Sequence, residues 1–284
     1  MNTITIAEAG LNHLGNLDEA KNLCLIAKAA GCDYIKFQKR SAPFYGTPEN
    51  ERDKDRNTPF GVMNTLKYRE KLEFETYEYA QISEYCRQIG IKWTASVWDL
   101  NSVVFLRNRD IDLVKIPSCK ITDFELIELV CKLFYDRTIV LSTGMSTENE
   151  IHRAVALINH KHIGDKYLLS CNSSYPIENL SQINLNRINT LKNKYSPFWK
   201  IGFSDHSYLL HTTIASVALG ATMIERHICS TKHGTVHPDA EASVLPWGLM
   251  KMINGIREVE QAMGDGKIEV YDSELPIRKK LRGN

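Results

Sequence analysis

Long apolar runs are missing from this chain of 284 residues. No stretch approaches the roughly 18–20 consecutive apolar residues that a bilayer-spanning helix needs. The N-terminus, from Met1 to Ile4, also lacks the basic and apolar segments of a secretory signal. The sequence therefore predicts a protein without membrane contact, and a cytoplasmic location is expected.

An excess of charge of one sign is missing as well. Lys and Arg number 35 and Asp and Glu 34, a formal net charge of +1 with neutral histidines. Nucleic-acid-binding proteins usually carry a marked basic excess, so we expect no nucleic-acid partner. The seven cysteines are odd in number and never spaced C-x-x-C, which argues against a disulfide framework or a zinc knuckle and favours reduced thiols.

What the sequence does contain is eight short apolar segments, each predicted to form a buried strand. Helical patterns follow most of them; Thr147 and Glu150, for example, form a predicted capping box. This alternation fits a closed (β/α)8 barrel, a single α/β domain over residues 1–284. An open doubly wound sheet is the alternative, but residues 8–15 after the first strand do not read G-x-G-x-x-G. The predicted strands are Ile4–Glu8, Tyr34–Gln38, Lys92–Val97, Leu113–Pro117, Thr138–Ser142, Tyr167–Cys171, Lys200–Phe203 and Met223–His227.

Two segments fall outside this repeat. The connection between the second and third strands is much longer than the others, and the excess, at about 39–74, is rich in proline and charge. An insertion of this length on a barrel is typical of a lid or binding loop, with a plain surface excursion as the alternative. The short tail Arg278–Asn284 is basic and is expected to be solvated.

Polar side chains cluster where the predicted strands end. Active sites of (β/α)8 barrels lie at the carboxyl ends of the strands, and an inward charge there needs a partner or a ligand. Two lysines with several hydroxyl groups favour a pocket for an anion, such as a small phosphorylated carboxylate. The residues at these ends are Glu8, Lys36, Gln38, Ser96, Lys115, Ser118, Ser142, Thr143, Ser173, Ser204, Asp205, His206, Glu225 and His227.

Two of the nine histidines stand out by position. His206 and His227 end the seventh and eighth strands, which are neighbours in a barrel, so both imidazoles could bind one divalent ion such as Mn²⁺, Fe²⁺, Co²⁺ or Zn²⁺. A hydrogen-bonded histidine pair is the alternative, and Asp205 and Glu225 could be ligands or orienting groups. The histidines 152, 160 and 162 are expected at the surface, and Cys171 is expected to be a buried structural thiol.

The same residues lie in an ordered set of motifs that resembles the sialic acid synthase family, phosphoenolpyruvate-condensing enzymes of the N-acetylneuraminate synthase type. The set spans almost the whole chain and is similar to a branch without the C-terminal antifreeze-like domain. The matching runs are AEAGLNHLGNLDEA at 7–20, KFQ at 36–38, KIPS at 115–118, LSTGMST at 141–147, SCNSSYP at 170–176, GFSDHS at 202–207, ALGATMIERHI at 218–228 and P-D-x-x-x-S at 238–243.

The resemblance implies a reaction and assigns residues to it. Such a barrel joins phosphoenolpyruvate to an N-acylated amino-sugar aldehyde (N-acetylmannosamine or a related sugar), giving a nine-carbon 2-keto-3-deoxy acid and phosphate. It implies a divalent metal, Mn²⁺ first and Mg²⁺, Co²⁺ or Fe²⁺ otherwise, on His206 and His227, and it leaves a homodimer open. Glu8 would act in catalysis. Phosphoenolpyruvate would contact Lys36, Ser96, Lys115, Ser118, Ser142, Ser173 and Ser204, and the sugar side would carry Glu8, Gln38, Tyr175 and Asp239.

One position departs from the resemblance, and three other functions stay open. Many members carry an acidic residue two positions after the serine of KIPS, where this chain has Lys120, so another group must replace that acid. The alternatives are a related synthase for a different aldose, phosphorylated or not; a Schiff-base aldolase built on Lys36 or Lys115; and an inactive barrel that serves as a binding subunit.

Overall fold

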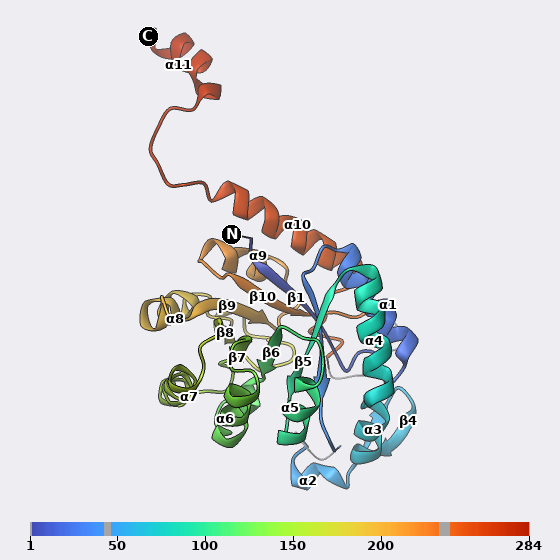
Figure 1. The fold of residues 1–284 in the computed structure, drawn as a ribbon. Coiled ribbons are helices and arrows are strands. Elements are labelled where there is room, and N and C mark those ends of the chain that lie inside the picture. The colour runs from blue at the N-terminus through green and yellow to red at the C-terminus, as the bar shows by residue number, and fades with distance from the viewer. Residues whose placement is uncertain (1, 43–46, 233–238, 284) are drawn as a thin grey trace.

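Eight parallel strands close into a barrel in the computed structural model, which describes residues 2–42, 47–232 and 239–283 (Figure 1). Around the barrel the order is β1-β10-β9-β8-β7-β6-β5-β2, so the open doubly wound alternative is wrong. All eight predicted strands are confirmed, with bounds that shift by two residues or fewer. The barrel strands are β1 (Ile4–Gly10), β2 (Tyr34–Lys39), β5 (Lys92–Val97), β6 (Leu113–Ile116), β7 (Thr138–Ser142), β8 (Lys166–Cys171), β9 (Lys200–Asp205) and β10 (Met223–His227).

Helices pack around the outside of the barrel and begin where the sequence supplies capping groups. Asn16 accepts hydrogen bonds from the backbone N–H groups of Asp18 and Glu19, and Thr147 and Glu150 form the predicted capping box. The helices are α1 (Leu17–Ala29), α2 (Glu49–Arg52), α3 (Thr65–Leu72), α4 (Thr76–Ile89), α5 (Leu100–Arg107), α6 (Phe124–Leu133), α7 (Glu148–Lys161), α8 (Arg187–Tyr195), α9 (His211–Ala218), α10 (Pro246–Ala262) and α11 (Leu275–Arg282).

One prediction about the histidines is wrong. His152 and His160 are exposed on α7, but His162 is buried. Its backbone is extended (φ −136°, ψ 135°) where it caps the end of α7, so it no longer follows the helical spacing that suggested exposure. The chain turns inward there toward β8, and burial lowers the pKa of His162.

Apolar side chains close the barrel interior at the amino ends of the strands. They form a separate cluster inside the ring, distinct from the larger core between the strands and the helices. This arrangement leaves the carboxyl ends of the strands as the side where a cavity can open. The inner cluster consists of Ile6, Tyr34, Leu113, Val140, Tyr167, Leu169 and Met223.

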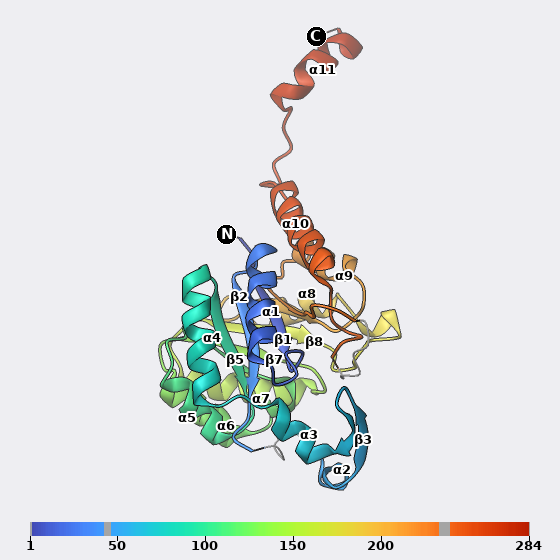
Figure 2. The same ribbon diagram turned by 90° about the vertical axis from the view of Figure 1, so that its right-hand side faces the viewer.

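The insertion after β2 is a small folded unit. It contains α2, the antiparallel hairpin of β3 (Asp55–Thr58) and β4 (Gly61–Asn64), and then α3, as Figure 2 shows beside the barrel. Tyr68 and Leu72 of α3 pack on Leu11 of the loop after β1. A side chain at Gly15 would lie 2.1 Å from the carbonyl oxygen of Lys71, so glycine is required for this close approach. Residues 43–46 of the predicted insertion lie outside the described residues.

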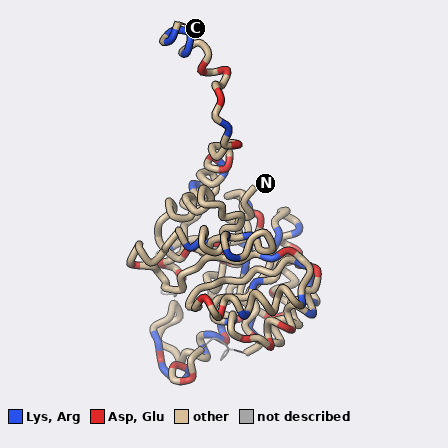
Figure 3. The backbone as a smooth tube through the Cα atoms, turned by 90° about the vertical axis from the view of Figure 1, so that its left-hand side faces the viewer, with Lys and Arg blue, Asp and Glu red and all other residues tan. Residues whose placement is uncertain are grey.

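The C-terminal residues leave the barrel as an extended arm. After α10, residues 264–283 run away from the strands and end in α11 (Figures 1 and 2). The described part of the predicted solvated tail, 278–283, is exposed, and Figure 3 shows its basic residues along the backbone at the tip of the arm. None of the described helices combines the length and the apolar character that a bilayer crossing requires.

Candidate active site

A cavity of about 300 Å³ opens at the carboxyl ends of the strands, where the sequence predicted a site. Most of the predicted site residues line it, but Thr143, Asp205 and Asp239 do not. Asp205 instead forms a buried ion pair of 2.9 Å with Arg226, and Oδ2 of Asp239 lies 3.9 Å from Nδ1 of His227. Pro238, the first residue of the P-D-x-x-x-S motif, lies outside the described residues. The lining residues are Glu8, Lys36, Gln38, Ser96, Trp98, Lys115, Pro117, Ser118, Cys119, Ser142, Met145, Cys171, Ser173, Tyr175, Ser204, His206, Glu225 and His227.

Strand alternation explains why the polar groups meet. Side chains two residues apart on a strand point to the same face. Ile6 and Met223 belong to the apolar cluster inside the barrel, and Glu8 and Glu225 follow them by two residues. The same step leads from Tyr34 to Lys36, from Leu113 to Lys115, from Val140 to Ser142 and from Leu169 to Cys171. The cavity floor is therefore the next layer above the apolar cluster.

Two buried lysines and two buried glutamates share this floor. Nζ of Lys36 lies 2.7 Å from Oε2 of Glu8 and 3.5 Å from Oε2 of Glu225, and Nζ of Lys115 lies 3.9 Å from the same Glu225 oxygen. Ser204 donates a hydrogen bond of 2.9 Å to the other oxygen of Glu225. Glu225 thus connects both lysines. From its position in the sequence Glu225 is predicted only as a metal ligand or orienting group, and this role between the lysines is not predicted.

The pKa values follow from burial and from these neighbours. Burial raises the pKa of Glu8 to about 7, although Lys36 opposes the shift. Burial also acts to raise the pKa of Glu225, but Lys115 and Lys36 outweigh it and hold that pKa at about 2. Burial lowers the pKa of Lys115, whereas Glu225 and Glu8 more than offset burial at Lys36 and raise its pKa. With Glu8 neutral, one carboxylate faces two lysines, so the cavity favours an anion.

Hydroxyl groups complete the cationic side. The Ser142 hydroxyl is buried and has no hydrogen-bond partner among the described residues. The backbone N–H of Gly144 donates to Oγ of Ser118 at 3.0 Å. A side chain at Gly144 would lie 2.2 Å from Oγ of Ser173 and 2.8 Å from Oγ of Ser118, so glycine lets these two hydroxyls converge. These groups supply directed donors next to the lysines.

The two predicted histidines lie side by side. The ring centroids of His206 and His227 are 5.4 Å apart, and both side chains are buried. Nδ1 of His206 lies 2.5 Å from the carbonyl oxygen of Asn172, which makes this nitrogen the donor and leaves Nε2 as an acceptor. Nδ1 of His227 has no hydrogen-bond partner among the described residues, and burial lowers the pKa of His227 to about 3.

These features fit a metal ion better than a simple histidine pair. The two rings do not hydrogen-bond to each other among the described contacts, and burial keeps the unpartnered Nδ1 of His227 neutral. At His206, Cys171 and the carbonyl of Asn172 outweigh burial and raise the pKa, so a proton would compete with a metal for Nε2. The Tyr175 hydroxyl lies 3.0 Å from Nε2 of His206 in the structure and would have to release it to a metal. In the described part of the chain no three His, Cys, Asp or Glu side chains form a complete metal site, so water or substrate oxygens would supply the remaining ligands.

Several lining residues were not predicted, and one was assigned only a structural role. Trp98, Cys119 and Met145 each follow a strand end closely, so the rule that located the other residues could have found them. Cys171 is buried as predicted, but it also lines the cavity, with Sγ 3.8 Å from Nδ1 of His206. Lys120 does not line the cavity and pairs with Asp123 at 3.0 Å.

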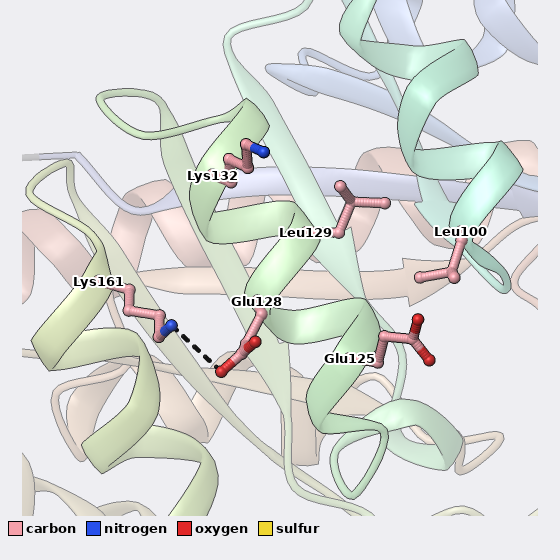
Figure 4. A pocket seen from close by; sticks show the side chains of 6 residues that line it. All are labelled: Leu100, Glu125, Glu128, Leu129, Lys132 and Lys161. Atoms are coloured by element: carbon pink, nitrogen blue, oxygen red, sulfur yellow. Dashed lines mark ion pairs between the residues drawn. The ribbon is translucent and has the colours of Figure 1, made fainter.

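A second hollow, of about 450 Å³, lies on the outer helical layer between α5, α6 and α7 (Figure 4). Glu128 and Lys161 form an ion pair of 3.2 Å across one side of it, and Leu100 and Leu129 contribute apolar surface. None of the predicted site residues reaches this hollow. The barrel cavity is therefore the candidate active site.

Glu225→Gln should destabilise the fold, because Lys36 and Lys115 would lose a shared buried carboxylate. Removing one partner of a buried ion pair costs about 3 kcal/mol or more, which at this chain length lowers the melting temperature by roughly 10 °C. Phosphoenolpyruvate, as a replacement anion, should restore part of the loss. Differential scanning calorimetry with and without phosphoenolpyruvate measures both effects. Glu125→Gln, on the outer helix α6, is the matched control, and equal melting temperatures for the two variants would contradict the role of Glu225.

The raised pKa of Glu8 predicts a pH-dependent stability. The unfolded chain releases this proton near pH 4.3 and the folded protein near pH 7, so the contribution of Glu8 to stability is present at low pH and is lost as pH rises through this window. The melting temperature of the wild type minus that of Glu8→Gln should fall by several degrees between pH 5 and pH 8. A difference that grows with pH would mean that Glu8 is ionised beside Lys36.

A closed (β/α)8 barrel with a cationic, imidazole-lined cavity at the carboxyl ends of its strands has the architecture of an enzyme of this fold. The NeuB family profile matches residues 23–268. An N,N'-diacetyllegionaminic acid synthase of Campylobacter jejuni is 33% identical, over 98% of this chain and 84% of the relative. The human N-acetylneuraminate-9-phosphate synthase is 32% identical, over 97% of this chain and 75% of the relative.

Among solved structures, the N-acetylneuraminic acid synthetase of Leptospira borgpetersenii in complex with citrate superposes with a TM-score of 0.85 and 30% identity. The match covers all of this chain and 94% of the Leptospira chain. The protein described here belongs to the NeuB family of sialic acid synthases. The family resemblance and the single-domain barrel predicted from the sequence are thereby confirmed.

Proposed function

We propose that this chain is a metal-dependent synthase that condenses phosphoenolpyruvate with an N-acylated amino-sugar aldehyde, N-acetylmannosamine or a related sugar. The products would be a sialic-acid-like 2-keto-3-deoxy nonulosonate and phosphate. The observation that supports this most is the meeting of two buried lysines, serine hydroxyls and two imidazoles in one cavity of a NeuB-family barrel. The named relatives make different nonulosonic acids, so the acceptor sugar is the finer part of the proposal.

Lys36 and Lys115 would hold the carboxylate and phosphate of phosphoenolpyruvate. Both ammonium groups are buried, where a charge–charge contact is screened less than in water. Ser142, Ser118 and Ser173 would add hydrogen bonds to the anionic oxygens, with Ser96 and Ser204 at the adjoining strand ends. These residues orient the enol toward the sugar side of the cavity and exclude water.

His206 and His227 would hold the divalent ion, Mn²⁺ first and Mg²⁺, Co²⁺ or Fe²⁺ otherwise. When bound, it would supply Lewis acidity that polarises the sugar aldehyde. His227 is neutral over the working pH range because burial lowers its pKa to about 3, so protons would not compete for the ion. The carbonyl of Asn172 fixes the ring of His206 in the tautomer that leaves Nε2 as an acceptor.

The carbon chemistry balances with one water. The enol carbon of phosphoenolpyruvate bonds to the aldehyde carbon, water adds at the resulting cationic C2, and phosphate leaves as the keto group forms. Of the two protons that the added water loses, one ends on the former aldehyde oxygen and the other leaves with the phosphate as HPO4²⁻. Glu8 would move the proton, because a carboxyl with a pKa of about 7 can donate and accept near neutral pH. Gln38, Tyr175 and Asp239 would contact the sugar.

Phosphate release from phosphoenolpyruvate tests this function. With Mn²⁺ present, release should require a sugar from a panel of N-acylated mannosamines, their 6-phosphates and other aldoses, and mass spectrometry should detect a keto acid with three added carbons. Chelation with EDTA should stop release, and Mn²⁺ should restore it. Sugar-independent release, or full turnover with EDTA, would contradict the proposal.

A Schiff-base aldolase is the second candidate, because burial lowers the pKa of Lys115 and favours a neutral amine. Borohydride reduction in the presence of pyruvate would trap such an intermediate as a mass increase on Lys115. We expect no trapping, since Glu225 lies beside this amine and favours its charged form. Turnover in the phosphate-release assay would exclude the inactive barrel, and the homodimer and the cytoplasmic location stay predictions.

A further inference from the structure

Arg40 follows β2 and is buried beside Gln38, on the sugar side of the cavity. It has no role in the proposed reaction steps. Its guanidinium lies 3.9 Å from the ring centroid of Trp98, and Nη2 donates a hydrogen bond of 2.7 Å to Oε1 of Gln38. Its backbone N–H donates to Glu73 at 2.9 Å, and Nη1 lies 3.8 Å from the same carboxylate. Arg40 is therefore fixed by the barrel and by the insertion together.

This contact determines which way the Gln38 amide faces. A guanidinium has only donors, so the carbonyl oxygen of Gln38 must face Arg40 and its amide nitrogen must face the other way. Nε2 of Gln38 lies 3.3 Å from Oε1 of Glu8, on the cavity floor. The reversed amide would place its N–H groups against the N–H donors of Arg40.

We propose that Arg40 is a positioning residue that holds the Gln38 amide with its N–H groups toward the cavity. The sugar side of the cavity then offers hydrogen-bond donors. The sugar must therefore place a hydrogen-bond-accepting oxygen there, either a hydroxyl or the carbonyl of its N-acyl group. This inference rests on the proposed function, because it specifies how that function selects its sugar.

A role in stability alone would not need a guanidinium here. Glu73 is the carboxylate closest to Arg40 in the described structure, and it also lies 3.5 Å from Nζ of Lys39. Nε of Arg40 is buried without a hydrogen-bond partner among the described residues. Burying a guanidinium is costly when its closest carboxylate, in the part of the chain that the structure describes, is shared with Lys39 and its Nε–H has no acceptor there. An apolar side chain would fill the same space against Trp98 at lower cost.

A double-mutant cycle with Arg40→Met and Gln38→Ala tests the proposal. Methionine keeps an unbranched side chain against Trp98 but removes the donors. Arg40→Met should raise KM for the sugar about 2- to 10-fold, because the amide then spends part of its time with its oxygen toward the cavity, and should leave KM for phosphoenolpyruvate unchanged. In the Gln38→Ala background the same substitution should have no further effect on sugar KM, and Arg40→Lys should recover part of the loss.

Arg56→Met is the matched control. Arg56 also belongs to the insertion and packs on an aromatic ring, that of Tyr68, but it has no hydrogen bond to Gln38 among the described residues. The Arg56→Met substitution should leave the KM for the sugar and the KM for phosphoenolpyruvate unchanged. Additive effects of Arg40→Met and Gln38→Ala, or an effect confined to the melting temperature, would overturn the positioning role.

A second readout separates this inference from the proposed reaction. In protein labelled with ¹⁵N-glutamine, the side-chain amide of Gln38 should give one sharp pair of proton signals in the wild type. In Arg40→Met the pair should shift and broaden as the amide becomes free to reverse. Unchanged signals would overturn the role of Arg40 whatever the turnover assay shows. If no sugar supports turnover but the signals change as described, the proposed reaction fails and the positioning role stands.

Discussion

His206→Ala and His227→Ala should each lower kcat by about 10³-fold or more while the protein stays folded. Each variant removes one of the two imidazoles that would hold the metal, and Lewis-acid assistance contributes several kcal/mol to the barrier. Both rings line an open cavity and lie outside the apolar clusters, so their loss should leave the barrel intact. Phosphate release measures activity, and elemental analysis should show Mn²⁺ falling from about one ion per chain to a small fraction.

His160→Ala is the control for this pair, because His160 is exposed on α7. It should keep both turnover and metal content. Wild-type turnover by His206→Ala in a chelated buffer would show that the imidazole pair has a structural role only. Loss of activity with full metal content would mean that these histidines contact the substrate and do not bind the metal.

Lys115→Met should raise KM for phosphoenolpyruvate about 100-fold or more and leave KM for the sugar nearly unchanged. Lys115 lies on the anion-binding side of the cavity, and a buried charge-assisted contact to a phosphate or carboxylate contributes on the order of 3 kcal/mol. Methionine has a similar volume, and the loss of the buried ammonium also leaves Glu225 with one fewer cation. Initial rates over a grid of both substrate concentrations separate the two constants.

Lys120→Met is the control for Lys115→Met, since Lys120 pairs with Asp123 outside the cavity. Its kinetic constants should match the wild type. An increase in sugar KM for Lys115→Met, with phosphoenolpyruvate KM unchanged, would mean that the two halves of the cavity are assigned the wrong way round.

The fold and most of the site could be predicted because both depend on local rules. Short apolar segments mark the strands, and the step of two residues from the apolar cluster to the cavity floor places Lys36, Lys115 and Ser142 without any knowledge of tertiary contacts. His206 and His227 were paired because consecutive strands of a barrel are neighbours. The family motifs then added Tyr175 and Asp239, which lie in loops, and assigned Gln38 to the sugar side.

The remaining features depend on contacts between distant segments. The bridge from Glu225 to Lys36 and Lys115 joins β10 with β2 and β6, and no spacing in the sequence encodes which carboxylate meets which amine. Arg40 is held at the site by Trp98 and Glu73, which lie over 30 residues later in the chain, as well as by Gln38. The helical spacing predicts an exposed His162, but α7 ends at Lys161, so His162 leaves that spacing and is buried. The hairpin of the insertion is short and polar, so it gives no clear strand pattern.

Anomalous diffraction from a crystal soaked with Mn²⁺ and phosphoenolpyruvate tests the central claim most directly. The account predicts one manganese peak within about 2.0–2.3 Å of a nitrogen of both His206 and His227, because first-row divalent ions bind imidazole at such distances. It also predicts phosphoenolpyruvate density with its anionic groups against Lys36 and Lys115. Manganese bound elsewhere, or phosphoenolpyruvate outside this cavity, would contradict the account.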